Sequence, residues 1–516
     1  MINDAIKNKQ TKLEKILFGI EKIGNKIPDP MMLFVYLSII TIIASAVLAY
    51  FDWSAINPVT KKVVKVYNLA TVDGLLKMLT SAISNFVTMP ALGMVLTCML
   101  GVGVANESGL FLVGLRGMVE RSKGSDLKII VIFIIACVLS HITGGTGFVV
   151  MPPLGALIFT AMGRNPLAGL MCAYASVTGA FACNVVVTSM DVITVSFTEA
   201  AAKMVIPDIT LSPAIGYYYS LATVIPVTIA AVLITTHVVE PRLGKYMGKG
   251  IDDGERSGKS ISELDFKALK YALWSMAIFA GVICAGIIPE HGILKDAATG
   301  SALTGKAPLM TSLAFIIALM FFIPGVVFGK VSGKFKDVRD VAKAMGKAMS
   351  DMGTYIAIIF VIAQFLKYFD WSNLGIIIAI KGAEILQNSG FPISIVVVLF
   401  VLMCSFLNLF IGSASTKWAI LSAVFVPMFM FLGYHPALPQ MAYLIGDAVT
   451  NPICPTDAYF SMLLVLAQKY DPEVGIGTLL ANMTPYAIAY LIIMTAILMI
   501  WFFLGLPLGP GAPLHI

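Results

Sequence analysis

The stretch "VTNPICPTDAY" (residues 449–459) places two prolines, an asparagine and an aspartate between two apolar segments. A segment that only had to cross a bilayer would avoid such residues, because every polar group left unpaired in hydrocarbon costs several kcal/mol. Proline also removes a helical hydrogen bond and leaves carbonyl groups without helical partners. The stretch therefore predicts a helix that is broken inside the membrane and holds polar groups there.

The composition is that of a polytopic membrane protein. Hydrophobic residues make up 58% of the 516 positions and charged residues only 12%, a balance that no soluble globular domain of this length needs. The formal net charge of +6 comes mainly from lysines and arginines in loops, which set membrane topology and do not indicate a nucleic-acid partner. We therefore expect membrane lipid to surround the chain.

Nine apolar runs are long enough to cross a bilayer, some with interruptions. They lie near residues 30–51, 86–113, 165–188, 212–239, 268–289, 308–329, 353–388, 437–469 and 479–506. The segments 127–162 and 393–432 instead consist of two shorter apolar pieces joined by small polar tips, "TGGTG" (143–147) and "GSAST" (412–416). Irregular backbone is tolerated at membrane depth only where protein or water satisfies it, so both segments predict re-entrant hairpins.

Clusters of lysine and arginine predict the orientation. They occur in the N-terminal segment and in the loops 116–128, 240–259 and 330–347. If these clusters face the cytoplasm, the N-terminus is cytoplasmic and the C-terminus lies outside the inner (plasma) membrane. The predicted organisation is an amphipathic cytoplasmic segment (1–29), a first repeat (30–239) with hairpin 127–162, a cytoplasmic linker (240–267) and a second half (268–516) with hairpin 393–432.

The two halves repeat a weak pattern. The matching pairs are Pro166 with Pro436, Asn184 with Asn451 and Asp191 with Asp457, at offsets of 270, 267 and 266. A steady offset indicates duplication. We predict an all-α fold of about nine transmembrane helices and two re-entrant hairpins, in two repeats of inverted topology. Such repeats with broken helices are typical of secondary transporters, whose solute and ion sites lie between the repeats near the midplane.

Oxygen-rich sites are predicted where the repeated helices break. Asn184 and Asn451 each offer a carbonyl oxygen to a cation and an amide to a solute carboxylate, and Thr178 and Thr450 lie nearby. Such ligands suit a hard cation such as Na⁺, and we expect no other cofactor. Asp447 lies four residues before Asn451 on the same helix face, which suggests cation or proton coupling. The alternative is that these side chains only hydrogen-bond neighbouring helices together.

The hairpin tips offer hydroxyl groups to the solute. The candidate residues are Thr143 and Thr146 in the first tip, and Ser413 and Ser415 in the second. Helix N-termini at these tips would direct their positive dipole ends at an anionic group. Small residues there would equally permit close helix packing.

Lys417 and Trp418 follow the second tip directly. A lysine at membrane depth is a functional candidate, although its ammonium group could also extend to the membrane surface. The indole ring offers a stacking face to an aromatic solute. We therefore include both residues among the predicted solute contacts.

Enzyme signatures are absent from the sequence. It contains no HExxH, no GxSxG in a strand-turn-helix setting, no Walker A motif and no dinucleotide-binding fingerprint. Without a nucleotide site, transport would have to use ion gradients.

Several stretches resemble the p-aminobenzoyl-glutamate transporter (AbgT) family of elevator-type ion transporters. They include "VVMPPLGALIF" (149–159), "MDVITVSFTEAA" (190–201), "AQFLKYFDWSNLG" (363–375), "IGSASTKWAIL" (411–421), "FVPMFMFLGYHPA" (425–437) and "LGLPLGPG" (504–511). The resemblance covers nearly the whole chain. It implies a homodimer of nine-helix, two-hairpin protomers that imports p-aminobenzoyl-glutamate or exports sulfonamide antimicrobials on a proton or sodium gradient.

The resemblance also implies particular site residues. The family's serine, tryptophan, two prolines and helix aspartate fall on Ser415, Trp418, Pro436, Pro455 and Asp447. Two positions depart from the family: Gly145 stands where an aspartate is expected, and Leu444 where an arginine is expected. Loss of the arginine removes a natural partner for a glutamyl carboxylate, so these departures bear on the solute and not on the fold.

The sequence thus predicts a cation-coupled secondary transporter for an anionic solute such as an aromatic amide. A Na⁺-coupled carrier of dicarboxylates, amino acids or short peptides is the alternative within this class. An intramembrane enzyme or a receptor is the alternative outside it, and neither a nucleophile with its base nor a metal-ligand set supports that reading.

Overall fold

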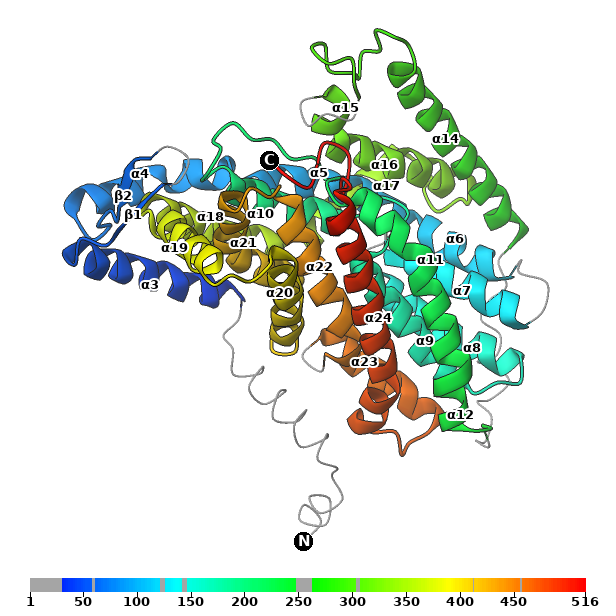
Figure 1. The fold of residues 1–516 in the computed structure, drawn as a ribbon. Helices are drawn as coiled ribbons and strands as arrows, with labels where there is room; N and C mark the ends of the chain where they lie inside the picture. Colours follow the sequence, from blue (N-terminus) through cyan, green and yellow to red (C-terminus); the bar gives the residue numbers. More distant parts are fainter. Residues whose placement is uncertain are drawn as a thin grey trace.

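The computed structural model describes residues 30–57, 61–120, 126–141, 146–246, 262–302, 307–411, 413–454 and 457–516. Within these ranges the chain is almost entirely helical, and the strands form one short antiparallel ribbon of β1 (Ser54–Ile56) and β2 (Val63–Lys65). Figure 1 shows helices of both halves packed side by side. The predicted helical membrane fold is confirmed, with the ribbon as an addition.

The elements of the two halves are as follows. The first half contains α3 (Pro30–Tyr50), α4 (Val72–Val87), α5 (Pro90–Ser108), α6 (Leu110–Glu120), α7 (Asp126–Ser140), α8 (Thr146–Ala161), α9 (Pro166–Gly179), η2 (Ala180–Ala182), α10 (Ser189–Ala202), α11 (Tyr217–Ile234), η3 (Thr235–Val239) and α12 (Glu240–Leu243). The second half contains α14 (Glu263–Ile287), α15 (Pro308–Thr311), α16 (Leu313–Val331), α17 (Val338–Asp351), α18 (Gly353–Trp371), α19 (Leu374–Asn388), α20 (Ile393–Asn408), α21 (Ala414–Phe431), α22 (Ala437–Thr450), η4 (Asn451–Ile453), α23 (Ala458–Tyr470) and α24 (Ile476–Leu504).

Eight helical stretches of the described chain are long and apolar enough to cross a membrane. They are Met31–Tyr50, Val72–Ser108, Tyr217–Leu243, Glu263–Ile287, Leu313–Val331, Gly353–Trp371, Ala414–Phe431 and Ile476–Leu504. All but Ala414–Phe431 overlap an apolar run that the sequence shows, and this exception is an arm of the second predicted hairpin. The predicted segment 1–29 lies outside the described residues, and the predicted linker 240–267 begins with α12 and ends within α14.

Helix α17 occupies a segment for which the sequence predicts only a charged loop. It begins at the N-cap Asp337, whose carboxylate accepts hydrogen bonds from the backbone N–H groups of Arg339 and Asp340 at 2.8 and 3.2 Å. The helix buries Ala344 and Ala348, and it contacts α5. Its many charged residues hide the apolar stripe from a simple hydropathy average, which explains the omission.

Each predicted hairpin leads into a broken helix, and the order of elements is the same in both halves. The first series is α7, α8, α9, η2 and α10, and the second is α20, α21, α22, η4 and α23. Helices α9 and α22 each have 14 residues and each ends in a three-residue 3₁₀ turn. Both arms of each hairpin contact the helix that follows, α9 or α22. This correspondence is consistent with duplication, while the inverted topology stays a prediction.

The element boundaries give a different register from the one derived from sequence. A cysteine with extended backbone follows each 3₁₀ turn, and Cys183 and Cys454 are therefore equivalent, at an offset of 271. Asn184 comes after its cysteine, whereas Asn451 comes before its own and begins η4. The two asparagines are therefore not equivalent. Pairing by residue type gave a different register because Asn184 lies after its 3₁₀ turn, whereas Asn451 lies within its own.

Helices α5 and α16 approach each other very closely. A Cβ atom placed on Gly101 of α5 would lie 1.9 Å from the backbone oxygen of Ala318 in α16. Small residues allow such approaches between helices in membranes, where packing and not hydrophobic burial drives association. This contact joins the two halves of the chain outside the hairpin region.

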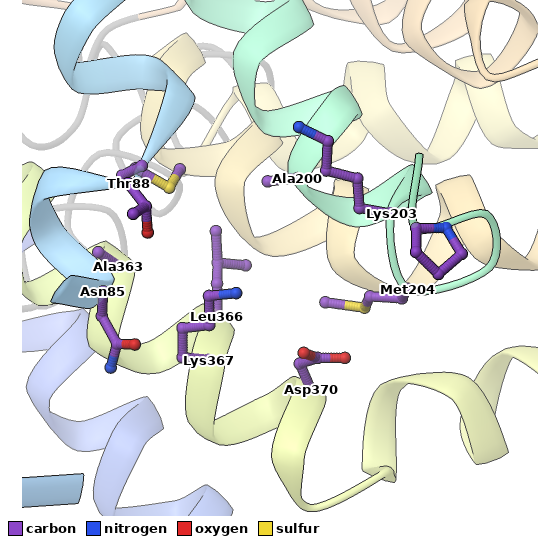
Figure 2. Close-up of a pocket in the computed structure, with 11 residues that line it drawn as sticks. Asn85, Thr88, Ala200, Lys203, Met204, Ala363, Leu366, Lys367 and Asp370 are labelled. Atoms are coloured by element: carbon purple, nitrogen blue, oxygen red, sulfur yellow. The ribbon is translucent and has the colours of Figure 1, made fainter. Parts of the chain in front are cut away.

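Helix α10 reaches two separate cavities. One lies between α10, the α4–α5 junction and α18 and has a volume of about 290 Å³ (Figure 2). The other, of about 410 Å³, lies between the two hairpin series. The second of these holds most of the predicted site residues that the structure brings together.

We expect Gly101→Ala to destabilise the protein by roughly 1–3 kcal/mol, because the added methyl group has no space against α16. The matched control is Gly93→Ala in the same helix, where a Cβ atom would meet nothing within 4 Å, so this variant should equal or exceed the wild-type stability. Thermal unfolding of the purified variants in detergent measures both. Equal melting temperatures for Gly101→Ala and the wild type would contradict the close contact.

Candidate functional site

The broken helix ends where the sequence predicts. Helix α22 stops at Thr450, residues 451–453 form a 3₁₀ turn that contains Pro452, and Cys454 is extended with φ −93° and ψ 100°. Proline lacks the N–H that would continue the helix. A new helix, α23, starts at Ala458 with Asp457 as its N-cap. The predicted interruption is confirmed. It brings α22, η4 and α23 to the edge of the cavity between the two hairpin series, which we call the cleft.

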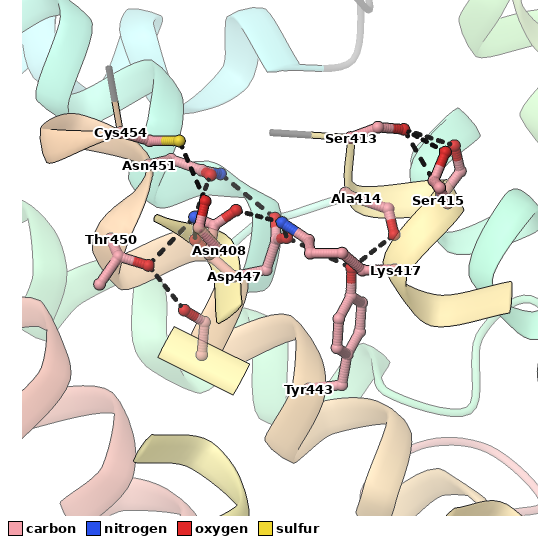
Figure 3. A network of polar contacts seen from close by, with 12 residues as sticks. Asn408, Ser413, Ala414, Ser415, Lys417, Tyr443, Asp447, Thr450, Asn451 and Cys454 are labelled. Carbon is pink, nitrogen blue, oxygen red and sulfur yellow. Dashed lines mark hydrogen bonds and ion pairs between the residues drawn. The ribbon is translucent and has the colours of Figure 1, made fainter. Parts of the chain in front are cut away.

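A buried ion pair lies at the centre of this region (Figure 3). The Nζ atom of Lys417 is 2.6 Å from Oδ1 of Asp447, and the two side chains are only 2% and 1% exposed. The hydroxyl of Tyr443 lies 3.2 Å from the same carboxylate, and the amide of Asn451 donates to Oδ2 at 3.3 Å. A buried pair of this kind persists only when its remaining polar atoms are satisfied.

Asn408 completes the polar network, although it was not among the site residues predicted from the sequence. Its side-chain oxygen accepts a hydrogen bond from Lys417. Its Nδ2 atom lies 3.0, 3.0 and 2.7 Å from the Asp447 carbonyl, the Thr450 hydroxyl and the Asn451 side-chain oxygen. The available signal was an asparagine at the end of an apolar hairpin arm, where an unsatisfied amide would be costly.

The cleft of about 410 Å³ lies beside this network and is lined by both halves. The first half contributes Phe148, Phe181 and Met190, and the second contributes Ser413, Ala414, Ser415, Asp447, Asn451, Asp457 and Tyr459. The rings of Phe148 and Tyr459 stack with centroids 4.4 Å apart and an interplanar angle of 11°. The cleft therefore combines an aromatic wall with hydroxyl groups and carboxylates.

Four of the predicted site residues line this cleft: Ser413, Ser415, Asp447 and Asn451. Ser413 is also the N-cap of α21, and its hydroxyl accepts a hydrogen bond from the Thr416 N–H at 3.4 Å. Lys417 is outside the lining and contacts the cleft only through Asp447. The Thr450 hydroxyl donates to the backbone carbonyl of Ser405 in α20 or of Gly446 in α22. The second tip and the broken helix are thus brought together as the sequence suggests.

Trp418 does not offer a stacking face to a solute. Its side chain is 0% exposed and is absent from the cleft lining. The indole stacks on Tyr443 with centroids 4.6 Å apart and donates to the Thr198 hydroxyl at 2.9 Å. Neighbouring helices cover the ring, so the structure places Trp418 in the helix packing, and its role as a solute contact stays a prediction.

Trp418 belongs instead to a set of hydrogen bonds that joins α10 to α21 and α22. Thr198 donates to Oε1 of Gln440 at 2.5 Å, and Nε2 of Gln440 donates to the Thr194 hydroxyl at 3.3 Å. All four side chains are buried. This polar lock, formed by Thr194, Thr198, Trp418 and Gln440, connects the first half to the second.

Three further predicted residues lie away from the cleft. Thr178 bonds to the carbonyls of Tyr174 and Ala175 in its own helix. Asn184 donates to the Val138 carbonyl of α7 at 3.5 Å, and Pro436 is the N-cap at the opposite end of α22. The prediction of a cation site near Asn184 therefore has no support in this conformation.

The remaining predicted positions concern the first tip and the end of the broken helix. Thr143, Gly145 and Pro455 lie outside the described residues, and Thr146 is described only as the first residue of α8. Asp191 forms a capping box with Thr188 at the start of α10. Asp457 is the N-cap of α23 and also lines the cleft.

The charged residues of the site, Lys417, Asp447 and Asp457, all belong to the second half of the chain. With the element boundaries as register, Ser176 of α9 corresponds to Asp447, and Ala180 of η2 corresponds to Asn451. Leu444, where an arginine was expected, is 1% exposed in an apolar setting. Lys417 therefore supplies the positive charge nearest to Asp447.

Among the described residues, no three His, Cys, Asp or Glu side chains gather to hold a metal ion.

Comparisons with known proteins are consistent across sequence and structure. Residues 15–516 match the family described as the AbgT putative transporter family. The p-aminobenzoyl-glutamate transport protein of Escherichia coli (strain K12) is 34% identical over 496 residues, 96% of each chain. The Alcanivorax borkumensis YdaH transporter has a TM-score of 0.88 at 37% identity, covering 94% of this chain and 100% of its own.

A second similar structure is MtrF of Neisseria gonorrhoeae, which is described as illuminating a class of antimetabolite efflux pumps. It has a TM-score of 0.90 at 36% identity, and the match covers 96% of this chain and 100% of MtrF.

We expect Lys417→Met to destabilise the protein by about 3–5 kcal/mol, because the buried Asp447 carboxylate loses its partner. Adding Asp447→Asn should recover much of this loss. The matched control is Lys65→Met, which breaks the exposed pair of Lys65 with Asp52 at 62% and 72% exposure and should cost under about 1 kcal/mol. Thermal unfolding in detergent tests the set, and equal losses for the two lysine variants would contradict the buried pair.

Proposed function

Since the chain belongs to the AbgT transporter family, we propose that this membrane transporter uses a cation gradient to move an anionic solute that carries an aromatic amide, such as p-aminobenzoyl-glutamate. The observation that carries the proposal is the cleft between the two hairpin series. It places an aromatic wall beside a buried carboxylate and a helix N-terminus. The name of the similar E. coli protein supports the solute class.

The proposed recognition divides the solute between the two halves. The aromatic ring would pack on the wall formed by Phe148, Phe181 and Tyr459, where ring pairs add about 0.5–1.5 kcal/mol beyond area burial. The carboxylates would accept hydrogen bonds from the Ser415 hydroxyl and the N-terminus of α21, whose dipole favours negative charge. Both parts of the solute then have chemically matched partners in one cleft.

Cation coupling would act through competition for Asp447. In this conformation the Lys417 Nζ atom lies 2.6 Å from Oδ1 of Asp447, and it also donates a hydrogen bond to the side-chain oxygen of Asn408. A proton or Na⁺ that binds Asp447 would weaken the ion pair and release Lys417. The side-chain oxygen of Asn408 now accepts from Lys417 and that of Asn451 from Asn408, and both oxygens could bind Na⁺ once Lys417 has left. A cation shifts the conformational equilibrium only by such differential binding.

The assembly of the protein and its orientation in the membrane are part of the same proposal. We propose a homodimer in the inner (plasma) membrane, with the N-terminus in the cytoplasm and the C-terminus outside, as the loop charges predict. The apolar side chains of α14, including Leu273, Trp274 and Ile278, are exposed and would contact lipid or a second protomer. The two hairpin series would move against the rest of the protein during transport.

Export is a second candidate direction. The fold matches MtrF, which is assigned to antimetabolite efflux pumps, with a TM-score of 0.90. The same cleft would accept an aromatic sulfonamide on its ring-lined wall. An imposed cation gradient in proteoliposomes distinguishes cation-coupled import from export. A symporter accumulates solute when the cation gradient points inward, whereas an antiporter accumulates it when the gradient points outward.

We expect Asp447→Asn to abolish gradient-driven accumulation, so that the solute only equilibrates across proteoliposomes. The reason is that the variant cannot exchange Lys417 for a cation. The double variant Lys417→Met with Asp447→Asn should fold well and still fail to accumulate solute. Asp351→Asn, on an exposed site of α17, is the control. Wild-type accumulation by Asp447→Asn across pH and Na⁺ concentration would show that the network is only structural.

We expect Tyr459→Leu to raise the half-saturating concentration of p-aminobenzoyl-glutamate by roughly 2–10-fold, because the cleft loses a ring face. Uptake of N-acetylglutamate, which has no ring, should change little. Phe503→Leu, whose parent residue is 72% exposed on α24, serves as the control. Equal losses for the two solutes would mean that Tyr459 only packs and would favour a carrier of dicarboxylates or amino acids.

A further inference from the structure

A second cavity lies away from the cleft and shares no lining residue with it (Figure 2). Its volume is about 290 Å³, and its walls come from α4, the α4–α5 junction, the end of α10 with the residues that follow it, and α18. The apolar part of its lining includes Met89, Met204 and Leu366, and the charged part consists of Lys203, Lys367 and Asp370. A cavity that combines an apolar surface with a few converging charges is a typical small-molecule site.

Lys203 is held in place from its own helix. Its Nζ atom is 2.5 Å from Oε1 of Glu199, one turn earlier in α10. Oε2 of Glu199 accepts a hydrogen bond from the backbone N–H of Leu211 at 3.0 Å. Glu199 is therefore fixed by two contacts, and it orients the Lys203 side chain along the cavity wall.

Lys367 and Asp370 extend from α18 on the other side of the cavity, as Figure 2 shows. Among the described residues, neither side chain takes part in an ion pair. Lys367 is exposed and Asp370 is half-buried. Both side chains therefore line the cavity without an ion-pair partner among the described residues.

Helix α10 connects this cavity to the cleft. Met190 lines the cleft and Lys203 lines the second cavity, and at 1.5 Å per residue the two positions are about 20 Å apart along the helix axis. The polar lock holds the part of α10 between them. A molecule bound in the second cavity would thus lie on the same moving element as the cleft.

We propose that this cavity is a second solute site, which takes a carboxylate between Lys203 and Lys367 and an N–H donor at Asp370. The inference rests on the proposed function and specifies where the solute binds before or after it occupies the cleft. A ligand with carboxylates, an amide and an aromatic amine fits both signs of charge. Asp370 disfavours a ligand that is only anionic, such as inorganic phosphate, because like charges repel.

Equilibrium binding of labelled p-aminobenzoyl-glutamate to the full chain in detergent tests the proposal. The wild type should show two sites per protomer. Lys367→Gln should weaken one site by roughly tenfold, the loss expected for one charge-assisted hydrogen bond, and leave the other unchanged. Lys336→Gln, which removes the same charge from a residue that lines neither cavity, should leave both sites intact. The affinity for p-aminobenzamide, which has no carboxylate, should be the same in Lys367→Gln and in the wild type.

The outcomes separate this inference from the proposed function. A single site that Lys367→Gln leaves unchanged would overturn the second site while supporting solute binding in the cleft. Two sites that both tolerate Lys367→Gln would also overturn it. Loss of one site in Lys367→Gln, combined with no transport by the wild type, would retain the second site and reject the transport proposal. Absence of any binding would reject both.

Discussion

The site depends on the cost of keeping two opposite charges in an apolar interior. Removing each ion from water costs several kcal/mol, and mutual attraction offsets this only when the other polar atoms are also satisfied. For Lys417 and Asp447, these contacts come from Asn408, Tyr443 and Asn451. The five residues belong to α20, α21, α22 and η4. One polar cluster therefore fixes the end of a hairpin arm, the start of the next and the break in the following helix.

The polar lock connects the helices that carry the ion pair to α10 in the first half of the chain. Trp418 follows Lys417 directly, so the residue that is adjacent to the ion pair in sequence also bonds to Thr198 of α10. Gln440 joins the same helix to α22. Because these bonds are buried, breaking them would leave polar groups unpaired. We infer that α10, α21 and α22 move as a single unit when the cleft changes its access.

Local signals in the sequence predicted the parts of the site that depend on one segment. Pro452 and its neighbours identified the helix break, and the four-residue spacing identified Asp447 and Asn451 as neighbours. Contacts between distant segments were not predictable in this way. Trp418 follows a predicted hairpin tip in sequence, and only the packing of Tyr443 over its ring shows that the indole lies away from the cleft. Asn408 carries no motif, so its role depends on the tertiary position of α20.

The uneven lining of the cleft has a consequence for how such a protein diverges. The charge network lies in the second hairpin series, while the first contributes Phe148, Phe181 and Met190. Selection on energy coupling would then act mainly on one copy of an ancestral duplication. The other copy could accept apolar replacements that reshape the wall. Under the proposed coupling, replacements among the cleft residues of the first series could change the preferred solute while the ion pair of the second series is left unchanged.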